Sequence, residues 1–241
     1  MQGLVLDGWS LVVVSGCVLA VLWFSISTLV APRLRSSTPL LDEQDRNEPI
    51  LSLLLLGPAS TGKSTIYHAA LALSGEANAA NPGEAVKPTL GLVQRLLSLP
   101  TATRRRQRCL LCDAGGGRKE RRQWVYLVKD ETAVGALVFV ADVADDTEET
   151  LFVFKQLISA KWAPSAVLLA LTHVDQLGEA QRRETCEARV RAYRGMSSRP
   201  FGVHCLDARD DVKVTRLLMD AASGIARVHR QTSQPNNLSM L

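Results

Sequence analysis

The stretch Leu53-Leu54-Leu55-Leu56-Gly57-Pro58-Ala59-Ser60-Thr61-Gly62-Lys63-Ser64 decides how this chain of 241 residues is expected to fold. The apolar run predicts a strand, and the turn after it has the G-x-x-x-x-G-K-[ST] pattern of a phosphate-binding loop. In such a loop the backbone N–H groups face anionic oxygens, Lys63 reaches the β- and γ-phosphates, and the Ser64 hydroxyl ligates Mg²⁺. Helical spacing after Lys63 adds the positive end of a helix dipole beneath the phosphates. The residues that we expect to bind a nucleotide here are Gly57, Pro58, Ala59, Ser60, Thr61, Gly62, Lys63, Ser64 and Thr65.

The chain on both sides of this loop alternates apolar runs with helical patterns. This alternation predicts an α/β fold, a mostly parallel six-stranded sheet with helices on both faces, within one domain over residues 50–230. The expected strands are Leu51–Leu56, Leu92–Leu99, Arg108–Cys112, Ala136–Ala141, Ala166–Leu171 and Phe201–Cys205. The expected helices are Lys63–Ser74, Thr147–Ala160, Glu179–Tyr193 and Val212–Val228. Residues 231–241 are polar and without periodicity, which is typical of a disordered tail.

The N-terminal region predicts one transmembrane helix over residues 11–31. The stretch from Leu11 to Val30 holds no charged residue and has the length that a bilayer core requires. A cleaved signal peptide and a buried core helix are the alternatives, but the first ten residues lack the basic region of a signal. Arg33 and Arg35 follow the span, so the positive-inside tendency places residues 1–10 across the membrane and the domain in the cytosol. Residues 32–49 are then a linker.

The cysteines and the basic clusters exclude some functions. Five cysteines at scattered spacing do not suggest a disulfide framework, and Cys109 and Cys112 should point to opposite faces of one strand. The net charge of +4 arises in two clusters, 104–108 and 118–122. No aromatic residues interleave with the first cluster as stacking partners, which disfavours nucleic-acid binding. Solvated loop charge, an anionic membrane surface and an acidic partner stay open for that cluster.

Two further tetrapeptides fit a magnesium-nucleotide site. Asp113-Ala114-Gly115-Gly116 follows an expected strand, where the Asp113 carboxylate can hold the Mg²⁺ shell and the Gly116 N–H can meet a γ-phosphate. In Pro88-Thr89-Leu90-Gly91 the Thr89 hydroxyl can complete the metal shell when a third phosphate is present. The expected metal-binding residues are therefore Ser64, Thr89 and Asp113. Lys63 and Gly116 are the expected catalytic residues.

In these motifs the chain resembles a small GTPase of the Arf-like (ADP-ribosylation-factor-like) group, over about residues 50–228. Trp124 follows the double glycine at the family's offset, Ala136–Asp142 resembles the next strand, and Asp175 closes a degenerate base-recognition motif. The resemblance implies the P-loop GTPase fold, GTP and GDP as ligands with Mg²⁺, and a switch in which Thr89 and Gly116 contact the γ-phosphate. The segments that carry Thr89 and Gly116 would face an effector or a receptor subunit.

The departures from the family pattern concern hydrolysis, base recognition and attachment. Gly117 stands where the family has its water-positioning glutamine, so intrinsic hydrolysis is expected to be slow unless Glu120, Gln123 or a partner substitutes. The guanine motif is Thr172-His173-Val174-Asp175, in which Asp175 can accept from guanine while Thr172 and His173 weaken the rest. Cys205-Leu206-Asp207-Ala208 is the expected last base-contacting loop, with Cys205 assigned to the nucleotide. Gln2 excludes the N-terminal myristoylation used by the family.

Two classes of function follow, and a protein of this kind that binds no nucleotide is a third possibility, against which the intact Lys63 and Ser64 count. One is a membrane-anchored Arf-like GTPase that recruits cytosolic partners. The other is a GTP-loaded binding module similar to the β subunit of the signal recognition particle receptor, which also joins a membrane span to an Arf-related domain and anchors the α subunit at the ER. Pro88-Thr89-Leu90-Gly91 favours the first class and the architecture favours the second. In either case the expected location is an endomembrane, the ER first.

Overall fold

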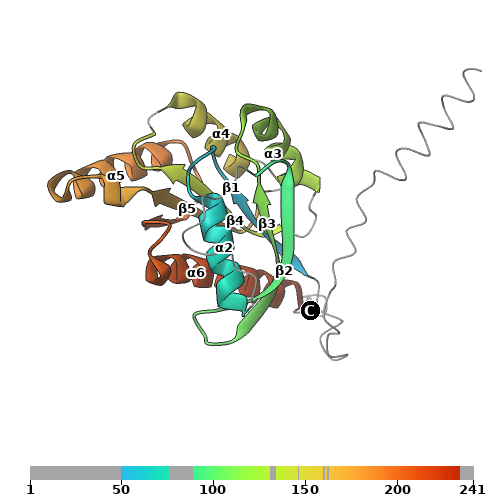
Figure 1. The fold of residues 1–241 in the computed structure, drawn as a ribbon. Coiled ribbons are helices and arrows are strands. Elements are labelled where there is room, and N and C mark those ends of the chain that lie inside the picture. The colour runs from blue at the N-terminus through green and yellow to red at the C-terminus, as the bar shows by residue number, and fades with distance from the viewer. Residues whose placement is uncertain are drawn as a thin grey trace, which may run out of the picture. The chain divides into compact units, whose positions relative to one another are not determined.

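A six-stranded sheet forms the centre of the part of the chain that the computed structural model describes, residues 50–75, 89–130, 134–145, 147–159, 161 and 163–233. Its strand order is β2-β3-β1-β4-β5-β6 (Figure 1). The strands are β1 (Leu51–Leu56), β2 (Leu92–Pro100), β3 (Arg106–Ala114), β4 (Val134–Asp142), β5 (Ala166–Thr172) and β6 (Gly202–Cys205). All neighbours pair in parallel except β2 and β3, which form an antiparallel hairpin. The predicted α/β fold with a mostly parallel six-stranded sheet is confirmed.

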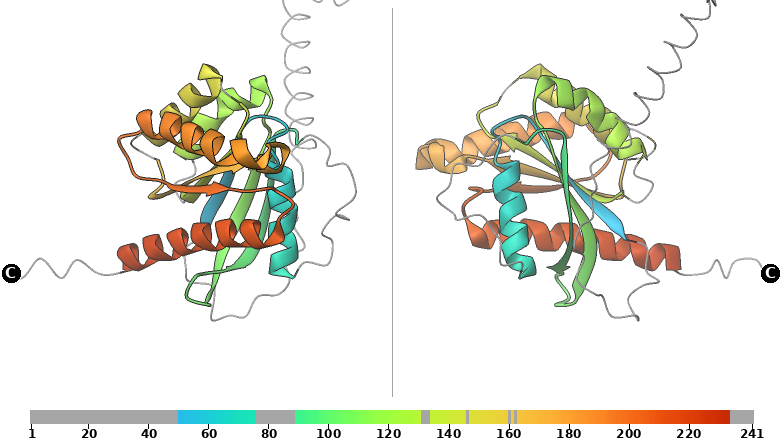
Figure 2. Two further views of the ribbon diagram at one scale, coloured as in Figure 1. Left: turned by 90° about the vertical axis from the view of Figure 1, so that its left-hand side faces the viewer. Right: turned by 45° about the vertical axis from the view of Figure 1, so that its right-hand side comes forward.

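Helices cover both faces of this sheet (Figure 2). Helices α2 (Lys63–Ser74) and α6 (Asp211–Ser233) pack on one face. Helices α3 (Arg118–Asp130), α4 (Glu148–Ser159) and α5 (Glu179–Gly195) pack on the other. A short 3₁₀ turn, Val174–Gln176, follows β5. Because both faces are covered, the central strands are continuous apolar runs rather than alternating ones.

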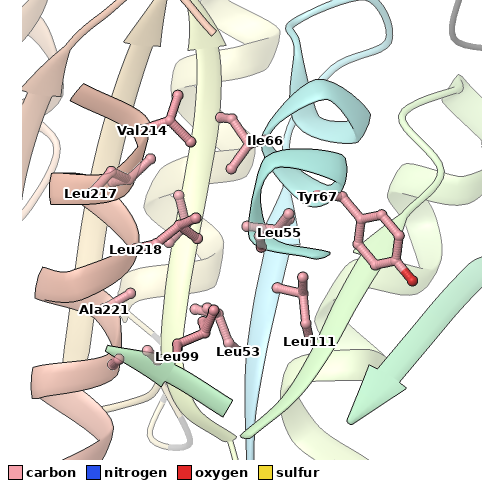
Figure 3. Packing of buried hydrophobic residues seen from close by; sticks show 14 of the residues in the cluster. Leu53, Leu55, Ile66, Tyr67, Leu99, Leu111, Val214, Leu217, Leu218 and Ala221 are labelled. Atoms are coloured by element: carbon pink, nitrogen blue, oxygen red, sulfur yellow. The ribbon is translucent and has the colours of Figure 1, made fainter. Parts of the chain in front are cut away.

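Strand β1 shows how the sequence fills both layers of the core. Leu53 and Leu55 are fully buried toward α2 and α6, where Figure 3 shows them beside Ile66, Val214 and Leu218. Leu54 and Leu56 are fully buried on the opposite face. Strand β3 behaves likewise, since Cys109 lies in the first layer and Cys112 in the second. The two thiols therefore lie on opposite faces of their strand, as predicted.

The expected elements match the observed ones closely, with one omission. Helix α2 begins and ends at the predicted residues, and the predicted strands all occur with ends shifted by up to two residues. Helix α3 was not predicted, because its first turns are dominated by charge, although apolar residues recur at helical spacing from Trp124 onward. Two buried side chains, Trp124 and Val128, attach it to the sheet. Helix α6 continues to Ser233, three residues into the segment expected to be a tail.

Several predictions from the sequence lie outside the described residues. These are the N-terminal tail (1–10), the membrane span (11–31), the linker (32–49), Pro88 and the C-terminal residues from 234 onward. Within the residues that are described, no helix has the length and apolar character needed to cross a bilayer.

Candidate nucleotide and magnesium site

The loop between β1 and α2 has the conformation of an anion-binding turn. Ser60 and Gly62 have left-handed φ angles of 62° and 83°, and this geometry turns successive backbone N–H groups toward one side. Among the described residues no side chain caps the N-terminus of α2, so the first N–H groups of that helix stay available to a ligand. Gly57 lies directly under β4: a Cβ atom there would stand 1.9 Å from the Val140 carbonyl oxygen. Any other residue at position 57 would displace the loop from the sheet.

Lys63, the first residue of α2, lies folded into this loop with only 5% of its surface exposed. Its Nζ donates to the Pro58 carbonyl at 2.6 Å, and the Thr61 hydroxyl donates to the same oxygen at 3.0 Å. Burial lowers the pKa of the Lys63 ammonium to about 8, with Asp113 opposing the shift and Arg121 adding to it. A phosphate beside Nζ would favour the charged form, so ligand binding should draw a proton onto this lysine.

The three expected metal-binding side chains meet at the N-terminus of α2. Ser64 Oγ lies 2.7 Å from Asp113 Oδ2 and 2.9 Å from Thr89 Oγ1, and Thr89 Oγ1 donates to the same carboxylate oxygen at 2.9 Å. These residues come from α2, the segment before β2 and the end of β3, so the fold alone brings them together. Asp113 is buried, and among the described residues its second oxygen, Oδ1, has no hydrogen-bond partner. Two hydroxyls and a carboxylate are the oxygen ligands that Mg²⁺ prefers, and the site fits that ion.

Gly115 and Gly116 connect β3 to this site through their backbone. The Ala59 N–H donates to the Gly116 carbonyl at 3.1 Å, so a backbone hydrogen bond joins the phosphate loop to the segment after β3. A Cβ atom at position 116 would come within 2.5 Å of the Ala59 nitrogen, which explains the need for glycine there. The buried Trp124 indole donates to the Gly115 carbonyl at 3.0 Å and fixes the segment from behind.

Arg121 is a site neighbour that the sequence did not reveal. Its Nε donates to the Gly116 carbonyl at 3.0 Å, and its Nη1 pairs with Glu149 at 3.2 Å. In the sequence Arg121 stands among Arg118, Lys119 and Arg122, and no local signal separates it from them. Only the helical phase of α3 turns Arg121 inward.

Of the two side chains considered as replacements for the missing glutamine, only Glu120 lines the cleft. A Cβ atom on Gly117 would lie 2.3 Å from Glu120 Oε2, so this carboxylate occupies the space beside position 117. Gln123 is exposed on α3 and lines no part of the cleft. Glu120 is thus the described side chain best placed to face a water molecule near Gly116.

The expected base-recognition residues follow β5 at the far end of the cleft. Thr172 is fully buried, and its hydroxyl lies 2.9 Å from the Thr61 carbonyl and 3.1 Å from the Ala141 carbonyl. It therefore ties the phosphate loop to β4 rather than facing the cleft. His173 has a left-handed φ of 58° and its Nδ1 lies 2.8 Å from Asp142 Oδ2. Asp175 is exposed and lines the cleft, which a residue that recognises a base must do.

Cys205 lies apart from the other predicted nucleotide-binding residues. It ends β6 with its side chain in the layer of α5, and it does not line the cleft. Burial, reinforced by the neighbouring Cys186, raises the pKa of its thiol to about 12. The next loop residues, Asp207, Ala208 and Arg209, line the cleft instead. Of the predicted tetrapeptide, Asp207 and Ala208 therefore line the cleft and Cys205 does not, because β6 ends at Cys205.

Together these segments enclose a cleft of about 480 Å³ at the carboxyl ends of β1, β3, β5 and β6. This volume is ordinary for a small-ligand site, and crevices at this edge are where open α/β sheets bind ligands. A larger cavity of about 750 Å³ lies along β6 and α6, but it contains no residue of the phosphate loop or of the Ser64, Thr89 and Asp113 group. The smaller cleft is the one that contains candidate phosphate- and metal-binding residues, among them Lys63, Ser64 and Thr89.

The arrangement can bind a polyphosphate at one end of the cleft and a flat base at the other. Backbone N–H groups and Lys63 face the phosphate end, and Asp175, His173 and Arg209 line the base end. No protein-family model matches the chain, and no curated protein is found to match it.

Proposed function

We propose that this protein is a membrane-anchored, Arf-like GTP-binding protein that binds GTP or GDP with Mg²⁺ and recruits a cytosolic partner in its GTP form. The observation that carries the proposal is the meeting of Ser64, Thr89 and Asp113 within 2.9 Å of one another beside the phosphate loop. Three motifs separated in the sequence supply one oxygen-rich site, which is the arrangement that a P-loop GTPase fold requires. The membrane anchor in this proposal is residues 11–31, on the sequence argument alone.

Each residue has a role that follows from its position. Lys63 and the N–H groups of the loop would hold the phosphates, while Ser64, Thr89 and Asp113 would hold the metal shell. Mg²⁺, when bound, supplies charge neutralisation on the phosphate oxygens. Gly116 offers a backbone N–H where no side chain blocks the approach. Asp175 would accept hydrogen bonds from guanine, and the switch segments around Thr89 and Gly116 would face the partner.

Hydrolysis in this proposal is slow. Gly117 has no side chain to orient a water molecule, and Glu120, the replacement beside it, carries a negative charge toward a negatively charged phosphate. One feature favours the second candidate, a GTP-loaded binding module like the receptor β subunit: the lack of a side chain at position 117 that could orient a water molecule.

The decisive experiment identifies the nucleotide. The full chain is purified in detergent, and its bound nucleotide is extracted and identified by mass spectrometry, for the wild type, Lys63→Ala and the exposed-lysine control Lys155→Ala. We expect guanine nucleotide near one equivalent in the wild type and in Lys155→Ala, and at least tenfold less in Lys63→Ala. Unchanged guanine nucleotide in Lys63→Ala, or equal competition by ATP and GTP, contradicts the proposal. A pull-down in the GTP form then separates the two candidates, since a large subunit with its own GTPase domain identifies the receptor.

A further inference from the structure

The end of the domain opposite the nucleotide cleft is basic. In a parallel sheet the amino ends of the strands share one edge, and here β1, β3, β4, β5 and β6 all begin at that edge. The exposed side chains around it carry positive charge, and we call them the basic end: Arg104, Arg105, Arg106, Lys161, Arg199 and Arg227. Both views in Figure 2 show the β2–β3 hairpin at the end of the domain away from the loop after β1.

Direct contacts hold several of these segments together at one end. The Ala102 N–H at the tip of the β2–β3 hairpin donates to Ser223 Oγ on α6 at 2.9 Å. Gly224, the next residue of α6, packs against Ala166 at the start of β5. Arg199, before β6, donates to the Ala163 carbonyl before β5 at 3.4 Å. The segments that carry these cations therefore lie at the same end of the domain.

The cleft end carries charges of both signs. Glu120, Asp175 and Asp207 line the cleft together with Lys63 and Arg209. By contrast, the hairpin segment 101–108 and the described segments just before β5 and β6 contain no acidic residue. Asp130, the last residue of α3, and Glu131 after it are the acids that the sequence places before β4. Charges of both signs therefore meet at the cleft, whereas the described segments around the start of β3, β5 and β6 carry cations without acids.

We infer that the basic end lies against an anionic lipid surface, so that the nucleotide cleft faces away from the bilayer. The chain enters β1 at Ile50, at the basic end, and this is the side from which the proposed anchor is connected. Lys and Arg side chains next to an anionic leaflet gain free energy that falls off within about a Debye length, roughly 10 Å. The absence of interleaved aromatic side chains in the hairpin suits a charged surface better than a nucleic acid. The inference rests on the proposed membrane attachment.

The test uses the full chain in lipid nanodiscs made of phosphatidylcholine alone or with about one third phosphatidylserine. A photocrosslinking amino acid replaces Thr103, which is exposed in the hairpin, or Ala180, which is exposed at the start of α5 near the cleft. We expect lipid adducts at position 103 that rise severalfold with phosphatidylserine and fall in high salt. Arg104→Ala with Arg105→Ala should reduce them about fivefold for each arginine. The matched double variant, Arg118→Ala with Arg183→Ala, should not reduce them.

Three results would overturn the inference: equal adducts at 103 in the two lipid mixtures, stronger lipid adducts at 180, or adducts of 103 with a protein instead of lipid in native membranes. Failure of the anchor itself is a separate outcome. A chain that is extracted by alkaline carbonate has no membrane span, whatever position 103 contacts. In that case flotation of the full chain with phosphatidylserine vesicles still tests the basic end.

Discussion

The proposed nucleotide binding should depend on pH, because it uses the buried Lys63. Its pKa of about 8 in the free protein means that about nine tenths of the molecules carry the ammonium at pH 7 and about one tenth at pH 9. Because phosphate binding requires the charged form, affinity is highest below pH 8 and falls as the pH rises through that value. We expect affinity for Mg²⁺-GTP to be about tenfold lower at pH 9 than at pH 7, which is about 1.4 kcal/mol.

Isothermal titration calorimetry of the full chain in detergent measures this effect. Titrations in buffers of different ionisation enthalpy give the number of protons that the protein takes up per nucleotide bound. That number should rise from about 0.1 at pH 7 to about 0.9 at pH 9. The Lys63→Arg side chain stays charged across this range. The affinity of this variant should therefore change with pH only through ionisation of the nucleotide and of other groups. Two results would refute this explanation: the same change of affinity with pH in the wild type and in Lys63→Arg, or the same proton uptake on binding in both proteins.

Three further predictions follow from single contacts. Asp113→Asn removes the carboxylate that accepts hydrogen bonds from Ser64 and Thr89. In a fluorescent-nucleotide assay with Mg²⁺, the affinity for GTP should fall about 10–100-fold. With a chelator in place of Mg²⁺, the affinity should change little. Gly117→Gln restores a water-orienting side chain and displaces only the flexible end of Glu120, so single-turnover GTP hydrolysis should rise at least about tenfold; an unchanged rate would mean that some other group limits hydrolysis. Trp124→Phe leaves the buried Gly115 carbonyl without its donor and should lower the free energy of unfolding in urea by about 1–3 kcal/mol. Tyr126 lies on the same helix and is 62% exposed, so Tyr126→Ala should change that free energy little.

The phosphate end of the site could be predicted from the sequence because its information is local. The pattern Gly57 to Ser64 fixes a strand, a turn and a helix within a few residues, and α2 begins and ends at the predicted positions. The base end was harder to predict. Cys205 was chosen at the end of a short strand whose end the sequence does not fix, and the residues that line the cleft begin two positions later, at Asp207 and Ala208. Helix α3 was missed although a signal was present, since Trp124, Leu127 and Val128 recur at helical spacing; the charged run 118–122 before them hides that pattern.

By itself, the sequence determined the alternation of strands and helices and the chemical types in each motif, since these depend on side chains close together along the chain. Tertiary structure alone decided which of those residues meet. It placed Ser64, Thr89 and Asp113 around one point, turned Arg121 and Glu120 toward the Gly116 segment, and used Thr172 to join the phosphate loop to β4. It also gathered scattered arginines at one end of the domain. The physical reason is that strand order in a parallel sheet brings distant segments to a common edge, and no local pattern of residues encodes that order.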